Sequence, residues 1–361
     1  MGEGRGQDVD WVIERYRSGD ERDILELFHI VFGTERSMEH WLWQFKDNPY
    51  GGPFATLARR SSDRRLAGHH IVMPFPLNVK GQQVRACHSL DLAVHPDHRG
   101  QGVFAATGRD CFEWCSSAGI QFVVAFPNAS SYPGFVRTLG WHRILFPNRY
   151  VLRLGIGRQV GRVLRLPLAA SAADLAYRSM RGVQLSARHA LLTKRAGSGV
   201  RFGISATVPD PYEALWDAWR SQEVLSVWKD SQYLRWRYDS NPDHDFRYLF
   251  LMRGPAMVAV AVMVELEGVA AICELLVGDR DVGLGQLLVS HVCLHAMERG
   301  MDKVRFVGFD AGFFDEILHG FDRQVAFENV FCGRAFQDRD LDALGAIAGN
   351  WTLTFGDGDF V

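Results

Sequence analysis

The sequence lacks the features that mark secreted, membrane-spanning and metal-binding proteins. Its six cysteines include no Cys-x-x-Cys pair, and Cys111 and Cys115 have no histidine pair at ligand spacing nearby. The first residues contain no apolar stretch typical of a signal peptide, and no run of about 18 apolar residues occurs anywhere. We therefore expect a cytoplasmic protein with buried, reduced thiols, no bound metal and no transmembrane segment.

The chain also has little net charge. A formal charge of −2 over 361 residues argues against a general nucleic-acid-binding protein. The charge is uneven, however, because residues 149–201 contain eleven lysines and arginines and one acid, Asp174. This stretch indicates either a linker with solvated helix faces or an anion site. The anion would be a nucleotide diphosphate or an acidic membrane surface, which leaves open a weak peripheral membrane contact.

The most informative segment that is present is a turn rich in glycine. It follows a predicted strand, Cys87–Val94, and opens a predicted helix, Val103–Ser117. The free N–H groups and the positive dipole end of such a helix bind phosphate. Gly100 and Gly102 allow a ligand close to the backbone, and Arg99 adds a permanent positive charge suited to a pyrophosphate.

Two familiar phosphate-binding loops match this turn poorly. A Walker loop ends in Gly-Lys-Ser/Thr, which is absent here. A dinucleotide fingerprint needs a glycine three residues after Gly102, where Ala105 stands, and it needs an early parallel βαβ unit. The predicted strands before the turn are antiparallel, so neither loop type explains the segment.

The turn resembles the signature Arg/Gln-x-x-Gly-x-Gly/Ala of the GNAT acyl-CoA N-acyltransferases. Arg99 and Gly102 match it, and Phe104 replaces the usual small residue. Asn128 follows the apolar strand 121–126. Residues 135–141 then resemble the aromatic-Tyr-x-x-x-Gly-aromatic segment that ends the family's domain. The order and spacing of these pieces agree over residues 55–145.

The resemblance implies a mixed-sheet α+β fold that binds acetyl-CoA or another acyl-CoA, without a metal. Strand 120–125 is expected to lie parallel beside residues 90–94, and in the family these neighbours splay apart to admit the acyl-pantetheine arm. The residues expected to hold the acyl-CoA are Leu92, Ala93, Val94, Arg99, Gly100, Gln101, Gly102, Val103, Phe104, Ala105, Asn128 and Ser131.

Amide formation also needs a proton acceptor for the amine and a donor for the leaving thiolate. On the strand before the turn, His88 has a suitable pKa range, and Asp91 carries a carboxylate that would bind an ammonium or act through water. The tyrosine that the family uses as acid is absent at Val136, so Tyr132, Ser131 or water is expected to replace it. Four further histidines lie nearby: we expect structural roles for His95 and His98, and one of His69 and His70 facing the cleft.

The chain repeats itself. Residues 43–49 and 236–242 share Trp, aromatic, Asn and Pro at identical spacing, and similar strands, a Gly-x-Gly turn and a helix follow each copy. In the second copy Val282 and Asp310 occupy the places of the arginine and the asparagine. Neither favours a pyrophosphate, so only the first copy is expected to bind the acyl donor.

These observations predict two tandem GNAT-like domains related by a pseudo-twofold duplication. We expect an acyl-CoA-binding domain at 1–152, a basic helical connector at 153–199 broken at Pro167, and a degenerate domain at 200–361. The C-terminal residues 351–355 alternate like a strand, and the Gly-Asp-Gly-Asp that follows them indicates an exposed turn.

Several functions fit this plan. Linked GNAT-like units with the repeated Trp-aromatic-Asn-Pro segment resemble bacterial acyltransferases of surface-polysaccharide biosynthesis, which implies a nucleotide-linked amino sugar as the amine acceptor of a monomer or dimer. Alternative acceptors are an antibiotic, a polyamine, an amino acid, a protein lysine or the amino-sugar precursor of a mycothiol-type thiol. A non-catalytic acyl-CoA-binding protein is the competing class.

Overall fold

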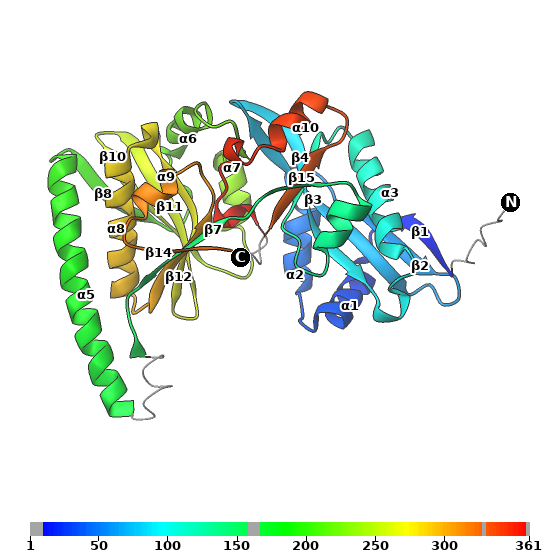
Figure 1. Ribbon diagram of the computed structural model, residues 1–361, viewed down its shortest axis with the longest axis horizontal. Helices are drawn as coiled ribbons and strands as arrows, with labels where there is room; N and C mark the ends of the chain where they lie inside the picture. The colour runs from blue at the N-terminus through cyan, green and yellow to red at the C-terminus, as the bar shows by residue number, and fades with distance from the viewer. Residues whose placement is uncertain (1–9, 158–166, 327–329, 359–361) are drawn as a thin grey trace. The chain divides into compact units, whose positions relative to one another are not determined.

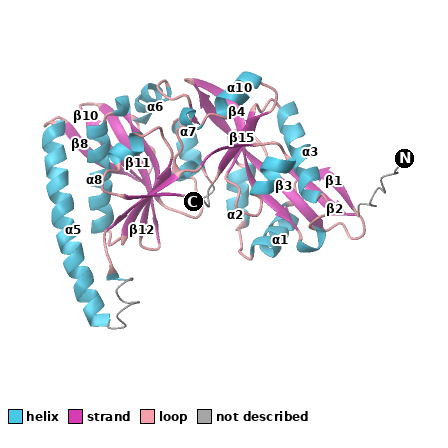
Figure 2. Ribbon diagram, viewed as in Figure 1, coloured by secondary structure: helices cyan, strands magenta, loops and turns pink. Residues whose placement is uncertain are grey.

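The computed structural model describes residues 10–157, 167–326 and 330–358 (Figure 1). The chain forms two compact units, each built around a mixed sheet with helices beside it (Figure 2). Unit 1 contains Met1–Leu77, Gln83–Leu145 and Glu328–Ile347, and unit 2 contains Asn78–Gln82, Phe146–Phe327 and Ala348–Val361. The predicted α+β class with two mixed sheets is therefore confirmed.

Unit 1 begins with strand, helix and meander, as the sequence predicts. Its sheet has the order β1-β2-β3-β4-β5-β15-β6, in which β4 and β5 are parallel. Its elements are β1 (Trp11–Arg15), α1 (Glu21–Phe32), α2 (Met38–Trp41), the π-turn η1 (Leu42–Lys46), β2 (Phe54–Arg60), β3 (Leu66–Val79), β4 (Gln82–Val94), η2 (Pro96–His98), α3 (Val103–Ser117), β5 (Phe122–Ala125), the π-turn η3 (Gly134–Thr138), β6 (His142–Leu145), β15 (Phe331–Ala335) and α10 (Arg339–Gly345).

Unit 2 repeats this order of pairing. Its sheet runs β8-β10-β11-β12-β13-β7-β14, with β12 and β13 as the parallel pair. Its elements are β7 (Asn148–Arg153), α5 (Pro167–Ala196), β8 (Val200–Ser205), α6 (Tyr212–Arg220), β9 (Leu225–Val227), α7 (Ser231–Leu234), the π-turn η4 (Arg235–Asp239), β10 (Phe246–Arg253), β11 (Ala256–Leu266), β12 (Val269–Val277), η5 (Gly278–Arg280), α8 (Val282–Glu298), β13 (Lys303–Gly308), α9 (Phe313–Ile317), β14 (Asp322–Val325), η6 (Ala348–Asn350) and η7 (Phe355–Asp357).

The repeated sequence segments adopt the same local structure. Each forms a short α-helix followed by a short π-helix, which are α2 and η1 in unit 1 and α7 and η4 in unit 2. The side chains of Ser37 and Asp230 cap the two helices by accepting backbone N–H bonds. Asn48 and Asn241 each accept a backbone N–H two residues on, which closes the turn into the next strand.

Each sheet includes strands that lie far in the chain from the strands they pair with. Strand β15, which follows the last strand of unit 2 in sequence, pairs with β5 and β6 of unit 1. Strand β7, which follows the last strand of unit 1, pairs with β13 and β14 of unit 2. Unit 1 therefore ends at Leu145 and regains residues 328–347, whereas the sequence suggests a continuous domain at 1–152.

The predicted connector belongs to unit 2. Leu185 and Leu192 of α5 lie in one hydrophobic core with residues of α8. Pro167 begins α5 instead of breaking it, because a proline in the first helical turn removes no intrahelical hydrogen bond. Leu175, Met180, Val183 and Leu191 are exposed on this helix. No helix in the described ranges is long and apolar enough to cross a membrane.

The C-terminal segment corrects a second prediction. Only isolated bridges form there, at Trp351 with Leu225 and at Leu353 with Phe309, and no continuous strand follows. Asp357 is buried at 7% exposure and pairs with Lys229 at 2.7 Å, so the expected exposed acidic turn is wrong at this residue. The other acid of that turn, Asp359, lies outside the described residues.

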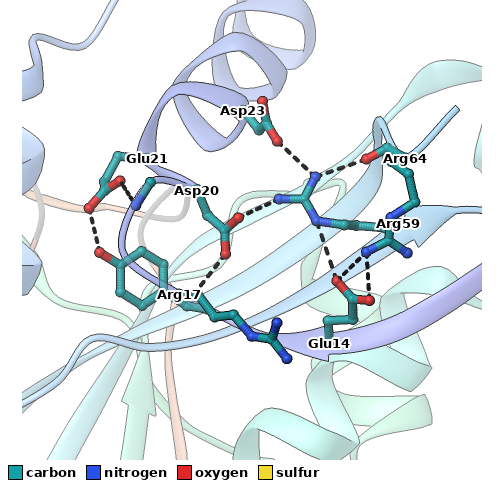
Figure 3. Close-up of polar contacts among 9 residues, drawn as sticks. Glu14, Arg17, Asp20, Glu21, Asp23, Arg59 and Arg64 are labelled. Carbon is teal, nitrogen blue, oxygen red and sulfur yellow. Dashed lines mark hydrogen bonds and ion pairs between the residues drawn. The ribbon is translucent and has the colours of Figure 1, made fainter.

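A deeply buried cation in each unit is matched by carboxylates. Figure 3 shows Arg59 of β2, which donates to Asp20 at 2.6 Å and to Asp23 at 2.7 Å. Burial opposes the charge of Arg59, but these carboxylates raise its pKa above the ordinary value. In unit 2 Lys229 lies between Glu274 at 2.5 Å and Asp357. Coulombic attraction from both acids outweighs burial and raises the pKa of Lys229.

Candidate active site

The glycine turn opens into a pocket of unit 1, as the phosphate-loop hypothesis requires. The pocket encloses about 520 Å³. It is lined by Val31, Phe32, Leu92, Val94, His98, Arg99, Gly100, Gly102, Val103, Phe104, Ala105, Asn128, Ser130, Ser131 and Thr138. Most residues expected to hold the acyl-CoA therefore lie around one cavity, while Ala93 and Gln101 do not line it.

The N-terminus of α3 is open toward a ligand. Gly102 is the N-cap residue and has φ +82°, a left-handed conformation that glycine adopts without strain. No side chain caps α3 and its first turn contains no acid, so its leading N–H groups and dipole meet no protein anion. Arg99 is exposed beside them. This arrangement suits the diphosphate of a coenzyme.

The turn before α3 is held by its own side chains. His98 is buried, and its Nδ1 lies 3.1 Å from the Oε1 of Gln101. The amide of Gln101 donates in turn to the carbonyl of Asp97 at 3.0 Å. His95 accepts a bond from the N–H of Asp97 at 3.3 Å. These contacts fix the turn, and they direct the Gln101 side chain back to the turn.

Strands β4 and β5 separate beside the pocket. Their parallel ladder runs from Ala86–Phe122 to His88–Val124. Strand β4 then continues to Val94, whereas β5 ends at Ala125. Backbone groups of β4 beyond this ladder are placed to bond an extended arm as an added strand would. Leu92 and Val94 of this stretch line the pocket.

Phe104 does not close the loop. Its ring packs on Gly134, where a Cβ atom would lie 2.5 Å from the ring, and stands edge-on to Phe135 at 5.9 Å. The bulky residue in the signature is thus accommodated by a glycine in η3, and the backbone of α3 stays accessible.

Asn128 organises the turn after β5. Its Oδ1 accepts bonds from the backbone N–H groups of Ser130 and Ser131, both at 3.0 Å, and from the hydroxyl of Ser131 at 3.2 Å. Asn128 and both serines line the pocket. Tyr132 donates its backbone N–H to Asn128 but is not among the lining residues.

The two candidate bases lie deeper than the pocket wall. His88 is 2% exposed, and its ring lies 5.7 Å from that of Phe126. Asp91 is 3% exposed and forms an ion pair with Arg36 at 2.5 Å. Neither lines the pocket. Sequence reasoning missed Arg36, which lies between α1 and α2 and carries no spacing signal toward Asp91.

His69 and His70 do not face the cleft, contrary to expectation. Both are fully buried, and burial lowers the pKa of each to about 3, so both are neutral. His70 bonds Ser89 at 2.7 Å, whereas neither ring nitrogen of His69 has a hydrogen-bond partner among the described residues. The six cysteines are also buried and free, and the described residues contain no group of three or more metal-binding side chains.

The comparison with known families agrees with this geometry. Residues 12–144 match the model of the acetyltransferase (GNAT) domain. The matched segment, which is less than half of the chain, is therefore similar to a GNAT acetyltransferase domain. No curated protein matches the chain by sequence.

Solved structures share the fold at low sequence identity. A probable N-acyltransferase of Enterococcus faecalis V583 is 11% identical, with a TM-score of 0.62 over 90% of this chain and 72% of that one. A GCN5-related N-acetyltransferase of Kribbella flavida is 15% identical, with a TM-score of 0.62 over 96% and 75%. A GCN5-related glucosamine N-acetyltransferase region of a fungal multi-domain GH3 β-N-acetylglucosaminidase is 12% identical, with a TM-score of 0.57 over 91% and 38%. These likenesses support the GNAT fold across both units.

Proposed function

We propose that the protein transfers an acyl group from acetyl-CoA or another acyl-CoA to the primary amine of a small acceptor, and that the acceptor is a nucleotide-linked amino sugar. The observation that carries the transfer is the uncapped N-terminus of α3, which opens into a pocket beside Arg99 and the separating strands β4 and β5. The amino-sugar acceptor is supported by the resemblance to polysaccharide acyltransferases and by the glucosamine N-acetyltransferase region among the similar structures.

The acyl donor is held by the pocket in this proposal. The diphosphate binds the N–H groups of 103–105 and Arg99, and the pantetheine arm bonds β4 at 92–94. The amine attacks the thioester carbonyl, which forms the amide bond and expels the coenzyme thiolate. Ser131 lines the pocket and is placed to protonate that thiolate, and Tyr132 is the alternative acid in the same turn.

His88 and Asp91 are proposed to act on the amine from behind the pocket wall. Asp91 is positioned by Arg36, and His88 lies at the last rung of the β4–β5 ladder, where the strands part. A proton reaches either group through water or after a side-chain movement that a bound acceptor would induce.

Release of free thiol from acetyl-CoA, measured against a panel of amines, tests the function. We expect turnover with a nucleotide-linked amino sugar and weaker turnover with free amino sugars, polyamines and amino acids. His88→Gln and Asp91→Asn each reduce kcat if they carry the proton. Unchanged rates in the double variant would remove both residues from the mechanism.

A second candidate function has its own support. Val136 stands where the family has its acid, and neither candidate base lines the pocket. Both observations favour a non-catalytic acyl-CoA-binding protein. That function predicts saturable acetyl-CoA binding, weakened in Arg99→Ala, with no thiol release for any amine.

A further inference from the structure

Unit 2 contains a polar pocket that the proposed transfer reaction does not use. It encloses about 950 Å³ beside β7, β13, β14 and the turn between β11 and β12. Arg149 and Arg153 of β7 and Lys303 and Arg305 of β13 line it. Arg153 pairs directly opposite Lys303 in the antiparallel ladder, and Val151 pairs opposite Arg305. Opposite residues share a face, so these cations gather on one face of the sheet.

Arg305 has no carboxylate to match its charge. Two other arginines are paired with several acids: Arg59 with Glu14, Asp20 and Asp23 (Figure 3), and Arg280 with Glu223 and Asp310. No described carboxylate forms an ion pair with Arg305. Its Nε atom is buried without a hydrogen-bond partner among the described residues.

The surroundings of Arg305 disfavour its positive charge. Burial, followed by the charge of Arg149, lowers the pKa of Arg305 below its ordinary value. The ring of Phe355 covers the guanidinium at 4.9 Å. A cation in this position is stabilised by any anion that enters the pocket.

The pocket also carries acids, and two of them are already engaged. Asp302 pairs with Arg178, and Glu265 pairs with Arg299 at 2.8 Å. The other acids that line it are Glu267 in the turn and Asp322 on β14. Arg305 thus faces this cavity with its Nε unpartnered among the described residues.

We propose that this pocket is a second ligand site, which binds the phosphate or diphosphate group of a small molecule. Arg305 would grip the phosphate oxygens through its fork of donors, and Lys303 and Arg149 would add point charge. The volume lies within the range of small-molecule sites, so a nucleoside diphosphate fits as well as a free phosphate ion. The lining residues of this site belong to unit 2, whereas the α3 turn belongs to unit 1.

Calorimetric titration of the full chain tests the site. The probes are pyrophosphate and UDP, and the variants are Arg305→Gln, Gly102→Asp, which blocks the α3 turn, and Lys194→Gln, an exposed change of the same charge on α5. We expect Arg305→Gln to weaken both probes at least about tenfold because it removes a charged phosphate contact. Lys194→Gln should leave both affinities unchanged, and Gly102→Asp, in which the α3 turn is blocked, should retain a binding event that Arg305→Gln weakens. Tighter binding of UDP than of pyrophosphate would identify a nucleotide ligand. Equal affinities would show that the phosphate group alone is recognised.

Three results would overturn the proposal. The first is the absence of binding of either probe to the unaltered chain. The second is loss of binding in Gly102→Asp with retention in Arg305→Gln, because the probe would then occupy the acyl-CoA turn. The third is an equal small loss in Arg305→Gln and Lys194→Gln. If Arg305→Gln lowers the melting temperature markedly, Lys303→Gln replaces it, with the same tenfold loss expected and an unchanged affinity counting against the site.

Discussion

The N-termini of α3 and α8 begin the corresponding helices of the two units, and they treat charge in opposite ways. Helix α3 has a glycine N-cap and no acid in its first turn. Helix α8 is capped by Asp281, whose carboxylate accepts the N–H of Leu284 at 3.0 Å. Beside it Arg280 pairs with Asp310 at 2.6 Å and with Glu223 at 2.8 Å.

In unit 2, the protein's own carboxylates thus occupy the helix N-terminus, which unit 1 leaves open. Asp310 follows β13 as Asn128 follows β5, and it pairs with a guanidinium where Asn128 only shapes a turn. A helix N-terminus that is already neutralised offers little to a phosphate. The difference teaches that positions at a helix N-terminus that are not left open to a ligand can form internal ion pairs instead.

The largest effect is expected where unit 2 buries its charge most deeply. Lys229→Met would leave Glu274 and Asp357 uncompensated at near-zero exposure and reduce the free energy of unfolding by about 4 kcal/mol. Chemical denaturation measures this loss. Any variant protein that remains folded should bind acetyl-CoA with unaltered affinity, and a selective loss of affinity would mean that unit 2 takes part in donor binding.

The next-largest effect is expected when an acid, as at the N-terminus of α8, is introduced at the N-terminus of α3. Gly102→Asp places a carboxylate where the diphosphate is expected and should weaken acetyl-CoA binding roughly 100-fold. Gly102→Asn is the matched control, since asparagine has the same shape and a similar tolerance of positive φ without the charge. Calorimetry on both separates repulsion from backbone strain, and equal affinities would contradict the open-turn hypothesis.

A smaller change removes the cation instead. Arg99→Ala should weaken acetyl-CoA binding roughly 10-fold to 30-fold and reduce its dependence on salt, because one phosphate contact is lost. Arg280→Ala in unit 2 should leave that affinity unchanged and lower the melting temperature, since Asp310 and Glu223 then lose the cation that offsets their buried charge. The prediction fails if the two arginines exchange these phenotypes.

The pH dependence of stability distinguishes the core of unit 1. His69 and His70 each have a pKa of about 3 in the folded protein against 6.5 ordinarily. Between these values the unfolded chain binds a proton that the folded protein excludes. The free energy of unfolding should therefore fall as pH falls from 6.5 to 3, by about 1.4 kcal/mol per pH unit for each histidine. His69→Leu should reduce this slope by about 1.4 kcal/mol per pH unit. The control His29→Gln, at an exposed position, should leave the slope unchanged.

The smallest effect concerns the cap of α8. Asp281→Ala should reduce the free energy of unfolding by about 1 kcal/mol, because one backbone N–H loses its acceptor. Asp281→Asn should retain most of the cap. Acetyl-CoA binding should be the same in both, and a change would show that the second helix N-terminus still affects the donor.

Local features of the chain were predictable because neighbouring residues determine them. Helix 103–117 and its glycine turn follow from positive-φ glycines between an apolar strand and an amphipathic stretch. The repeated Trp-aromatic-Asn-Pro segment likewise has matching turns in both units. The pocket around Arg99, Gly102 and Asn128 was predictable from this local geometry together with the family resemblance, which implies how distant strands pair.

Long-range partners were not predictable from one sequence. Strands β7 and β15 have ordinary apolar patterns, and no local signal indicates which sheet they join. The ion pairs of Asp91 with Arg36 and of Asp357 with Lys229 likewise link residues far apart in the chain. A Gly-Asp-Gly-Asp stretch has the composition of a solvated turn, and only its buried lysine partner reverses that expectation.

The crossed placement of β7 and β15 also determines when each half can mature during synthesis. Residues 10–145 emerge first, yet β5 and β6 lack the strand that joins them until the ribosome has added Phe331–Ala335. The nascent first half must therefore keep unpaired edges of β5 and β6 until residues 331–335 have been translated.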